Sequence, residues 1–239
     1  MDEKSLKTSW KQRAVILAIA ILLLGSTIFA YVFIVLSGNS GSSTSEQEAL
    51  IEKLADEYDA KGKEVEAAAV PLSERYLDGF KGYLSEVKAY NSATANSAGL
   101  EIKDLKEGSG KTLAENDLEY VAYYIGWCAD GSIFDSSFNF EDEDTKKNPV
   151  SLKAPIYAAI GLIEGWNQGV IGMKVGGVRQ ITMSGDLAYG DNNQVCGGEP
   201  NTPLKFIVMP IDDTDMVNLN RDLEDIYLQL YYAYYGLML

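Results

Sequence analysis

Imidazole and thiol side chains, which commonly serve acid–base, nucleophilic or zinc chemistry, are absent or scarce in this chain. The sequence contains no histidine and only two cysteines, Cys128 and Cys196. Without imidazole, the usual general base at neutral pH, the His-dependent triads and the His-containing zinc sites are excluded, and two cysteines cannot form a four-thiolate site. We therefore expect a protein that uses neither a metal nor another cofactor.

Two kinds of segment resemble ligand sites but lack the required spacing. The run GSGKT at 108–112 resembles a phosphate-binding loop, yet that loop needs glycine five positions before Gly110, where this chain has Leu105. The acidic runs at 141–144 and 212–215 lack the loop spacing and the glycine of a calcium site. We interpret the first segment as a turn and the acidic runs as solvated surface.

The charge balance excludes one class of partner. The chain has 20 Lys and Arg against 35 Asp and Glu, a net charge of −15. Phosphate binding needs clustered cations, so we expect no nucleic-acid partner.

Residues 14–36 form an uncharged apolar run of 23 residues. A helix of that length is about 34 Å long, enough to cross a hydrocarbon core. A cleaved signal peptide is the competing interpretation, but its apolar region is shorter and ends at a small-x-small site, for which Ile28 and Ala30 are a poor match. Because four cations lie within residues 1–13, we expect a cytoplasmic N-terminus, a single membrane-spanning helix at 14–36, and the rest of the chain outside.

A flexible spacer at 37–45 leads into a helical segment at 46–90. Apolar residues repeat there at steps of three and four, and Pro71 is expected to interrupt the pattern. The segment could be a helical hairpin, a stalk, or an arm that forms a homodimer, and the apolar stripe could equally pack on its own chain. A second spacer, NSATANSA at 91–98, marks a domain boundary.

From Leu100 onward the pattern changes to short alternating runs rich in β-branched and aromatic residues. Three of these runs, at 118–127, 177–183 and 205–211, are typical of strands, and 163–171 is typical of a short helix between glycines. The sequence therefore predicts a domain of mixed α and β structure after the helical segment.

Three blocks of this region resemble FKBP-type peptidyl-prolyl isomerases. They are GLEIKDLKEGSGKTLAENDLEYVAYYIGWCADGSIFDSS (99–137), LIEGWNQGVIGMKVGGVRQITMSGDLAYGD (162–191) and PNTPLKFIVMPI (200–211). The resemblance covers under half of the chain, in the family's order and spacing. It implies an α+β fold, in which a curved antiparallel sheet wraps around a short helix with an apolar, proline-accepting pocket between them.

The resemblance also implies a set of site residues, position by position. The expected catalytic residues are Tyr124, Asp135, Trp166 and Tyr189, and the expected substrate-binding residues are Phe134, Val150, Leu162, Ile163 and Phe206. Trp166 matches the indole at the pocket floor. Asp135 could orient a neighbouring tyrosine, polarise the twisting carbonyl, or be an ordinary buried turn acid.

The chain departs from the family pattern at two places. Val150 follows an insertion-prone stretch, so its alignment to an aromatic wall position is loose. Gly198 stands where the family commonly has an aliphatic wall residue, which puts substrate affinity in doubt more than the fold.

An apolar pocket can catalyse this reaction without acid–base groups. Amide resonance gives rotation about an X-Pro bond a barrier of about 20 kcal/mol. Twisting the bond reduces the charge separation, so apolar surroundings disfavour the planar state relative to the twisted one. Lowering the barrier by about 5 kcal/mol shortens the step more than a thousandfold.

A disulfide between Cys128 and Cys196 becomes permissible if the domain lies outside the cytoplasm. It would tie the strand after Tyr124 to the glycine-rich loop. Sequence cannot show whether the two Cα atoms lie within the ~7 Å that a bridge needs, so the pairing stays open.

The tail at 213–239 contains a further helix, expected from Asn220 with that residue as its N-cap. Domains of the resembled family end near Ile211, so this helix is an addition. It could pack on the 46–90 helices as a second small core, or offer a tyrosine-rich surface to a client.

These inferences together predict a membrane-anchored, extracytoplasmic prolyl isomerase, with its isomerase domain at 99–212, that acts on proline-containing exported polypeptides. The alternative is a non-enzymatic chaperone or adaptor that only binds proline-containing segments.

Overall fold

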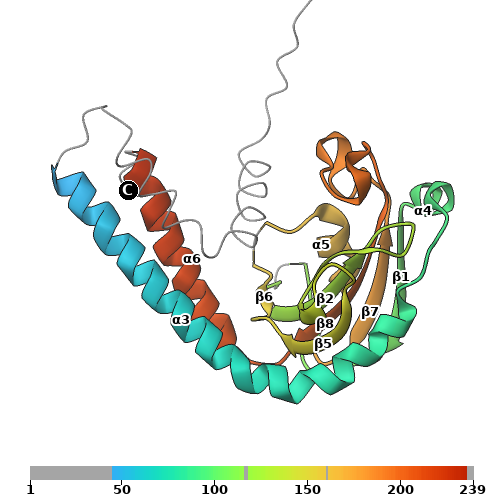
Figure 1. Cartoon of the computed structure of the whole chain (residues 1–239), viewed down its shortest axis with the longest axis horizontal. Coiled ribbons are helices and arrows are strands. Elements are labelled where there is room, and N and C mark those ends of the chain that lie inside the picture. The colour runs from blue at the N-terminus through green and yellow to red at the C-terminus, as the bar shows by residue number, and fades with distance from the viewer. Residues whose placement is uncertain (1–44, 116–117, 160, 236–239) are drawn as a thin grey trace, which may run out of the picture. The chain divides into compact units, whose positions relative to one another are not determined.

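The computed structural model describes residues 45–115, 118–159 and 161–235 (Figure 1). The cytoplasmic segment expected at 1–13, the span at 14–36 and all of the 37–45 spacer except Ser45 lie outside these residues. Within the described ranges, no helix is both long enough and apolar enough to cross a membrane. The described residues divide into two compact units, one within 63–221 and one of 45–62 with 222–235.

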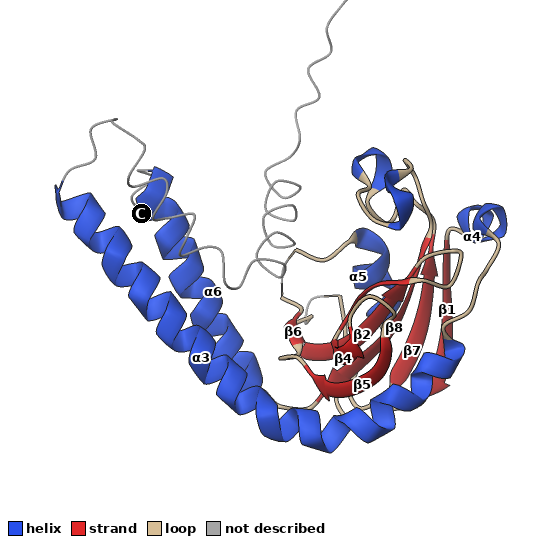
Figure 2. Ribbon diagram, in the orientation of Figure 1, coloured by secondary structure: helices blue, strands red, loops and turns tan. Residues whose placement is uncertain are grey.

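The larger unit has α+β structure, built on an antiparallel sheet in the order β1-β7-β8-β2-β3, with β6 also paired to β2 (Figure 2). Its strands are β1 (Leu100–Lys106), β2 (Val121–Trp127), β3 (Ile133–Ser136), β6 (Ile156–Tyr157), β7 (Val178–Met183) and β8 (Leu204–Ile211). The predicted strands at 118–127, 177–183 and 205–211 correspond to β2, β7 and β8. The sequence signal for these strands was the alternation of β-branched and aromatic residues.

Helix α5 (Glu164–Val170) packs on one face of this sheet. Two glycines let it approach closely. A Cβ on Gly165 would lie 2.8 Å from Met183, and one on Gly169 would lie 2.7 Å from Ile181, both on β7. The predicted short helix at 163–171 therefore forms, and its small residues set its distance from the sheet.

Helix α3 (Ser45–Lys81) continues through Pro71, so the expected interruption was wrong. A proline inside a helix costs about 3 kcal/mol because it removes a hydrogen bond and crowds the preceding turn. Buried apolar side chains flank Pro71 and offset that cost: Val65, Ala69, Leu72 and Phe80. Phe80 packs beside Tyr123 and Phe138, which places this part of α3 on the sheet face opposite α5. A short 3₁₀ helix (Gly82–Glu86) follows.

The expected spacer at 91–98 is instead helix α4 (Ser92–Ala98). Asn91 caps it, because its side chain accepts a hydrogen bond from the N–H of Thr94 at 2.9 Å. Asn96 then accepts a bond from the N–H of Gly185. The composition resembled a linker, but a capping asparagine followed by alanines also suits a short helix.

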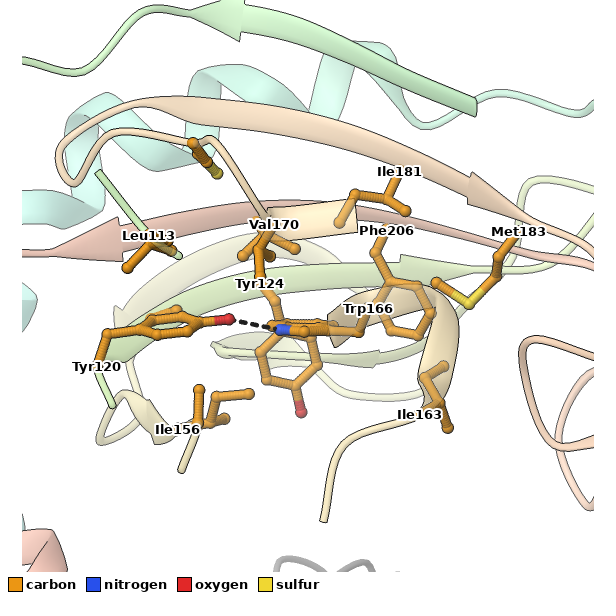
Figure 3. Close-up of a cluster of buried hydrophobic side chains, with 14 of the residues drawn as sticks. Leu113, Tyr120, Tyr124, Ile156, Ile163, Trp166, Val170, Ile181, Met183 and Phe206 are labelled. Carbon is orange, nitrogen blue, oxygen red and sulfur yellow. Dashed lines mark hydrogen bonds between the residues drawn. The ribbon is translucent and has the colours of Figure 1, made fainter. Parts of the chain in front are cut away.

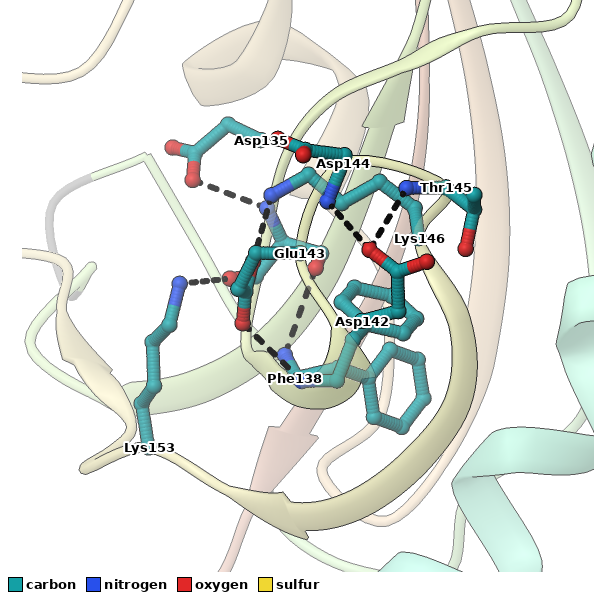
Figure 4. Close-up of polar contacts among 10 residues, drawn as sticks. Asp135, Phe138, Asp142, Glu143, Asp144, Thr145, Lys146 and Lys153 are labelled. Carbon is teal, nitrogen blue, oxygen red and sulfur yellow. Dashed lines mark hydrogen bonds and ion pairs between the residues drawn. The ribbon is translucent and has the colours of Figure 1, made fainter.

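The insertion-prone stretch forms a separate hairpin of β4 (Phe138–Asp142) and β5 (Lys147–Leu152). Its acidic run makes local bonds at the turn (Figure 4). Asp142 accepts from the N–H groups of Asp144 and Thr145. A side-chain hydrogen bond with Thr145, together with these backbone bonds, holds the pKa of Asp142 below its ordinary value. Glu143 accepts from the N–H of Phe140, so the carboxylates at 142 and 143 both stabilise the turn.

Helix α6 (Thr214–Tyr235) begins earlier than predicted. Its cap is Asp213, which accepts a bond from the N–H of Met216 at 2.8 Å, whereas Asn220 lies inside the helix and bonds the Met216 carbonyl. In the smaller unit, the end of α6 packs on the start of α3 through Ile51, Leu54, Leu230 and Ala233. This confirms the expectation that the tail forms a second small core with the 46–90 segment.

Candidate functional site

The candidate site is an aromatic cluster between α5 and the inner face of β2. Side chains alternate along a strand, so Tyr120, Ala122 and Tyr124 share the face that meets α5. Trp166 reaches the same cluster from the first turn of α5, whose position is set by a bond from the N–H of Trp166 to the carbonyl of Ile163 at 3.0 Å. Helix and sheet thus bring together residues that are 46 positions apart.

The indole of Trp166 is braced by the edges of other aromatic rings (Figure 3). Its centroid lies 5.6 Å from that of Tyr124 and 5.4 Å from that of Phe206, at interplanar angles of 75° and 74°. Phe134 in turn meets Phe206 edge-on at 5.6 Å. Edge-to-face contacts are favourable for aromatic pairs, so these rings form a stiff apolar surface.

Two tyrosine hydroxyls belong to the site. Tyr124 donates a hydrogen bond of 2.5 Å to Asp135, which also accepts one from the N–H of Ser136 at 2.8 Å. Burial and the nearby Asp135 charge raise the pKa of Tyr124 well above its ordinary value, and the same causes raise the pKa of Tyr189 to about 12. Both hydroxyls are therefore protonated at neutral pH, and Asp135 orients Tyr124.

Other predicted site residues lie around the cluster. Phe134, Leu162 and Tyr189 are partly buried and pack against it, and Ile163 belongs to its buried part. Val150 does not join them. It lies on β5 with 58% of its surface exposed, because β4 and β5 pair with each other and are not part of the main sheet in the described residues.

The loop after Tyr189 supplies an aliphatic contact that the sequence did not reveal. Gly198, expected at a wall position, is exposed with a φ of +77°, a conformation that suits glycine. Val195, three residues earlier, packs against the cluster instead. Tyr120 was also missed, although extending the period-two alternation back from Tyr124 would have found it.

Cys128 and Cys196 form a disulfide, with Cα atoms 5.4 Å apart. Cys128 follows the last residue of β2, and Cys196 packs against the aromatic cluster. The bridge therefore fixes the loop that carries Val195 to the end of the strand that carries Tyr124.

A hollow of about 560 Å³ lies beside the disulfide, lined in part by Asn96, Asp130 and Asn201. These polar groups are bonded within the chain: Asn96 donates to the carbonyl of Asn201, and Asp130 accepts from Ser132. An apolar cluster with oriented hydroxyls suits catalysis on an amide better than this hollow does. Across the residues described, no group of three or more His, Cys, Asp or Glu is placed to hold a metal ion.

Comparison with known proteins identifies the family. Residues 110–209 match the family model described as FKBP-type peptidyl-prolyl cis-trans isomerase. The FK506-binding protein of Neisseria meningitidis serogroup B is 35% identical over 112 residues, which cover 46% of this chain and 92% of that protein. The chain belongs to this family.

Further comparisons place the isomerase among longer and shorter relatives. The peptidyl-prolyl cis-trans isomerase Mip of Chlamydia trachomatis serovar D is 35% identical over 116 residues, 48% of this chain and 42% of that protein. A crystal structure of a peptidyl-prolyl cis-trans isomerase from Pseudomonas syringae pv. tomato matches 58% of this chain and 92% of that chain at 24% identity, with a TM-score of 0.38.

This chain is thus an FKBP-type peptidyl-prolyl cis-trans isomerase. The region matched by the family model runs from before β2 to within β8 and contains Tyr124, Asp135, Trp166, Tyr189 and Phe206. Helices α3 and α6 lie outside that region and are additions to the isomerase domain.

Proposed function

We propose that this isomerase rotates X-Pro bonds in exported polypeptides, outside the cytoplasm, while residues 14–36 hold it in the membrane. Two observations support this. The apolar run at 14–36 follows four cations, which favours a cytoplasmic N-terminus. The Cys128–Cys196 disulfide is typical of proteins that fold in an oxidising compartment.

The observation that carries the assignment of the site is the braced indole of Trp166. In our proposal the prolyl ring of the client packs on this indole, between Tyr124, Phe134 and Phe206. Only 2% of the Trp166 surface is exposed, whereas Phe134, Leu162 and Tyr189 are partly exposed. Rim side chains must therefore turn aside as the proline enters.

Catalysis then follows from the surroundings of the amide. The planar bond is more dipolar than the twisted one, so an apolar contact surface raises its energy relative to the transition state. The hydroxyl of Tyr189 and the backbone N–H of Ile163 would donate hydrogen bonds to client carbonyls. Asp135 acts as a positioning residue, since it bonds the hydroxyl of Tyr124.

The test of the site is a proline-isomerisation assay on the full chain in detergent. Trp166→Phe should lower kcat/KM at least tenfold, because a smaller ring leaves the prolyl contact incomplete. Trp127→Phe is the matched control, because Trp127 is equally buried but bonds the Lys88 carbonyl outside the cluster. Equal kcat/KM for wild type and Trp166→Phe would contradict the site.

The test of the anchor is fractionation of cells. The full chain should sediment with membranes and be digested by protease added outside the cytoplasmic membrane, whereas a chain that lacks residues 1–36 should remain soluble. Recovery of the full chain in the soluble fraction would contradict anchoring.

A further inference from the structure

The indole of Trp166 makes one directional contact, and it is with Tyr120. Nε1 of Trp166 donates a hydrogen bond of 2.8 Å to the hydroxyl oxygen of Tyr120 (Figure 3). Tyr120 is 4% exposed and Trp166 is 2% exposed. A tryptophan has a single N–H donor, so this bond uses all of its polar capacity. With both groups buried, bulk water is not a ready substitute partner.

Tyr120 is itself fixed by the sheet and not by the helix. It directly precedes β2, and its carbonyl accepts a hydrogen bond from the N–H of Ala158 at 2.9 Å. The bond from Trp166 therefore connects the first turn of α5 to the sheet. Burial raises the pKa of the Tyr120 hydroxyl, so the oxygen stays protonated and neutral while it accepts this bond.

The other contacts of Trp166 cannot replace the bond to Tyr120. Tyr124 and Phe206 make edge-to-face contacts with the indole, with ring centroids 5.6 Å and 5.4 Å from its own. Such contacts limit displacement of the ring, but they have broad angular preferences. A hydrogen bond weakens steeply away from a straight N–H···O angle, so it fixes the plane of the indole.

We propose that Tyr120 is a positioning residue of the isomerase, which fixes the plane of the Trp166 indole and keeps its N–H turned away from the client. This inference rests on the proposed packing of the prolyl ring on Trp166. With the N–H occupied, the surface under the ring is apolar. An unoccupied N–H would bond the carbonyl of the planar, more dipolar amide and stabilise the ground state more than the transition state.

That distinction predicts a specific kinetic signature. Removal of the Tyr120 hydroxyl should lower kcat about tenfold without raising KM, because the ground state gains a contact that the twisted state loses. If the Tyr120 hydroxyl had a purely structural role, its removal would instead reduce the fraction of folded enzyme or raise KM. The two roles are therefore separable by measuring kcat and KM on folded protein.

The experiment compares Tyr120→Phe with Tyr123→Phe in the full chain. Tyr123 lies on the opposite face of the same strand region, is fully buried, and its hydroxyl has no hydrogen-bond partner among the described residues. Both variants delete one buried oxygen. We expect kcat to fall about tenfold in Tyr120→Phe and to stay within twofold of wild type in Tyr123→Phe.

A spectroscopic readout follows the bond itself. In ¹H–¹⁵N spectra, the indole resonance of Trp166, assigned by its loss in Trp166→Phe, should shift and exchange faster with solvent in Tyr120→Phe. It should stay in place in Tyr123→Phe. If Tyr120→Phe does not fold, benzothienylalanine at position 166 removes the same bond together with the N–H itself. It therefore tests only whether the bond fixes the plane of the ring: we expect kcat to fall about threefold, and an unchanged kcat would contradict that part of the role.

The double variant separates this inference from the proposed site. In a Trp166→Phe background, Tyr120→Phe should lower kcat by less than twofold further. Full activity of Trp166→Phe would contradict the proposed site. Two results would contradict the proposed role of Tyr120. One is an impaired Trp166→Phe together with wild-type kcat in Tyr120→Phe. The other is an effect of Tyr120→Phe on kcat that is just as large in the double variant.

Discussion

The two faces of β2 are built from the same kinds of residue but differ in their polar pairing. All seven residues of the strand are buried. On the inner face, Tyr124 bonds Asp135 and lies beside Trp166. On the outer face, the ring centroids of Tyr123 and Phe80 lie 6.1 Å apart, and the hydroxyl of Tyr123 has no hydrogen-bond partner in the described part of the chain. Burial alone therefore does not distinguish the face that carries the candidate site from the face that packs on α3.

The difference suggests a division between the two faces, one serving stability and the other catalysis. The outer face, covered by α3, should contribute to the free energy of unfolding and little to catalysis. The inner face should contribute mainly to catalysis, because its side chains are held by directed bonds and edge contacts. Phe80→Ala and Gly126→Ala test this division, and two further variants test contacts elsewhere in the domain.

Phe80→Ala on the outer face should have the largest effect on stability. Phe80 is fully buried between Tyr123 and Phe138, and truncating a buried phenylalanine typically costs about 3–5 kcal/mol. Denaturant unfolding measures the loss. Val70→Ala is the control, since Val70 is on the same helix and 58% exposed. A tenfold lower kcat in the folded fraction of Phe80→Ala would contradict the division.

Loss of the disulfide should have the second largest effect. The bridge joins residues 68 positions apart, and its removal by Cys128→Ser with Cys196→Ser should cost about 2–4 kcal/mol by freeing the unfolded chain. Thermal unfolding with and without a reductant measures this. Reductant should destabilise wild type and leave the double variant unchanged, and an equal response of the two proteins would refute the contribution of the bridge.

Gly126→Ala should act on the inner face. A Cβ there would lie 2.8 Å from Phe134 and 2.8 Å from Phe206, so both rings would have to shift. Overpacking of this kind costs about 1–3 kcal/mol, and we expect kcat/KM to fall about tenfold. Gly79→Ala is the control, because a Cβ there meets nothing within 4 Å and a helical alanine is favourable. Wild-type kcat/KM for Gly126→Ala would show that the rings adapt freely.

Asp104→Asn should have the smallest effect, visible as a change in pH dependence. Arg179 donates to Asp104 through Nε and to the Gly169 carbonyl at 2.9 Å, and the bond lowers the pKa of Asp104. A lowered folded-state pKa gives stability that is present above the unfolded pKa, about 4, and is lost as the pH falls through the folded value.

The expected size of this effect is below about 1 kcal/mol, because the side chain of Asp104 is 54% exposed. Unfolding measured at pH 6 and at pH 3 should differ less in Asp104→Asn than in wild type. An unchanged difference would mean that the pair adds nothing to acid stability.

Sequence predicted the parts of the molecule in which local pattern and final packing agree. The strands that became β2, β7 and β8 alternate clearly, and the helix that became α5 is bounded by glycines. Asn220 shows the limit of such patterns, because its residue type suits a cap but the helix begins earlier, where Asp213 accepts a hydrogen bond from the N–H of Met216. Pro71 was misjudged for a related reason, since sequence gives its local cost but not the burial that offsets it.

A place in the aromatic cluster could be predicted for side chains that point into it from a regular element, as Tyr124, Trp166 and Phe206 do. It was missed where the contact depends on loop geometry. Val195 takes part because a loop tied by Cys196 turns it inward, and Val150 does not because its hairpin stands apart from the main sheet. Neither path of the backbone can be read from residue types.

The raised pKa values of the Tyr124 and Tyr189 hydroxyls have a consequence for how activity responds to pH. The chain has no imidazole, and neither of these two phenols loses its proton anywhere near neutrality. Turnover should therefore change little between mildly acidic and mildly alkaline solution, unlike that of an enzyme whose catalytic histidine titrates in this range.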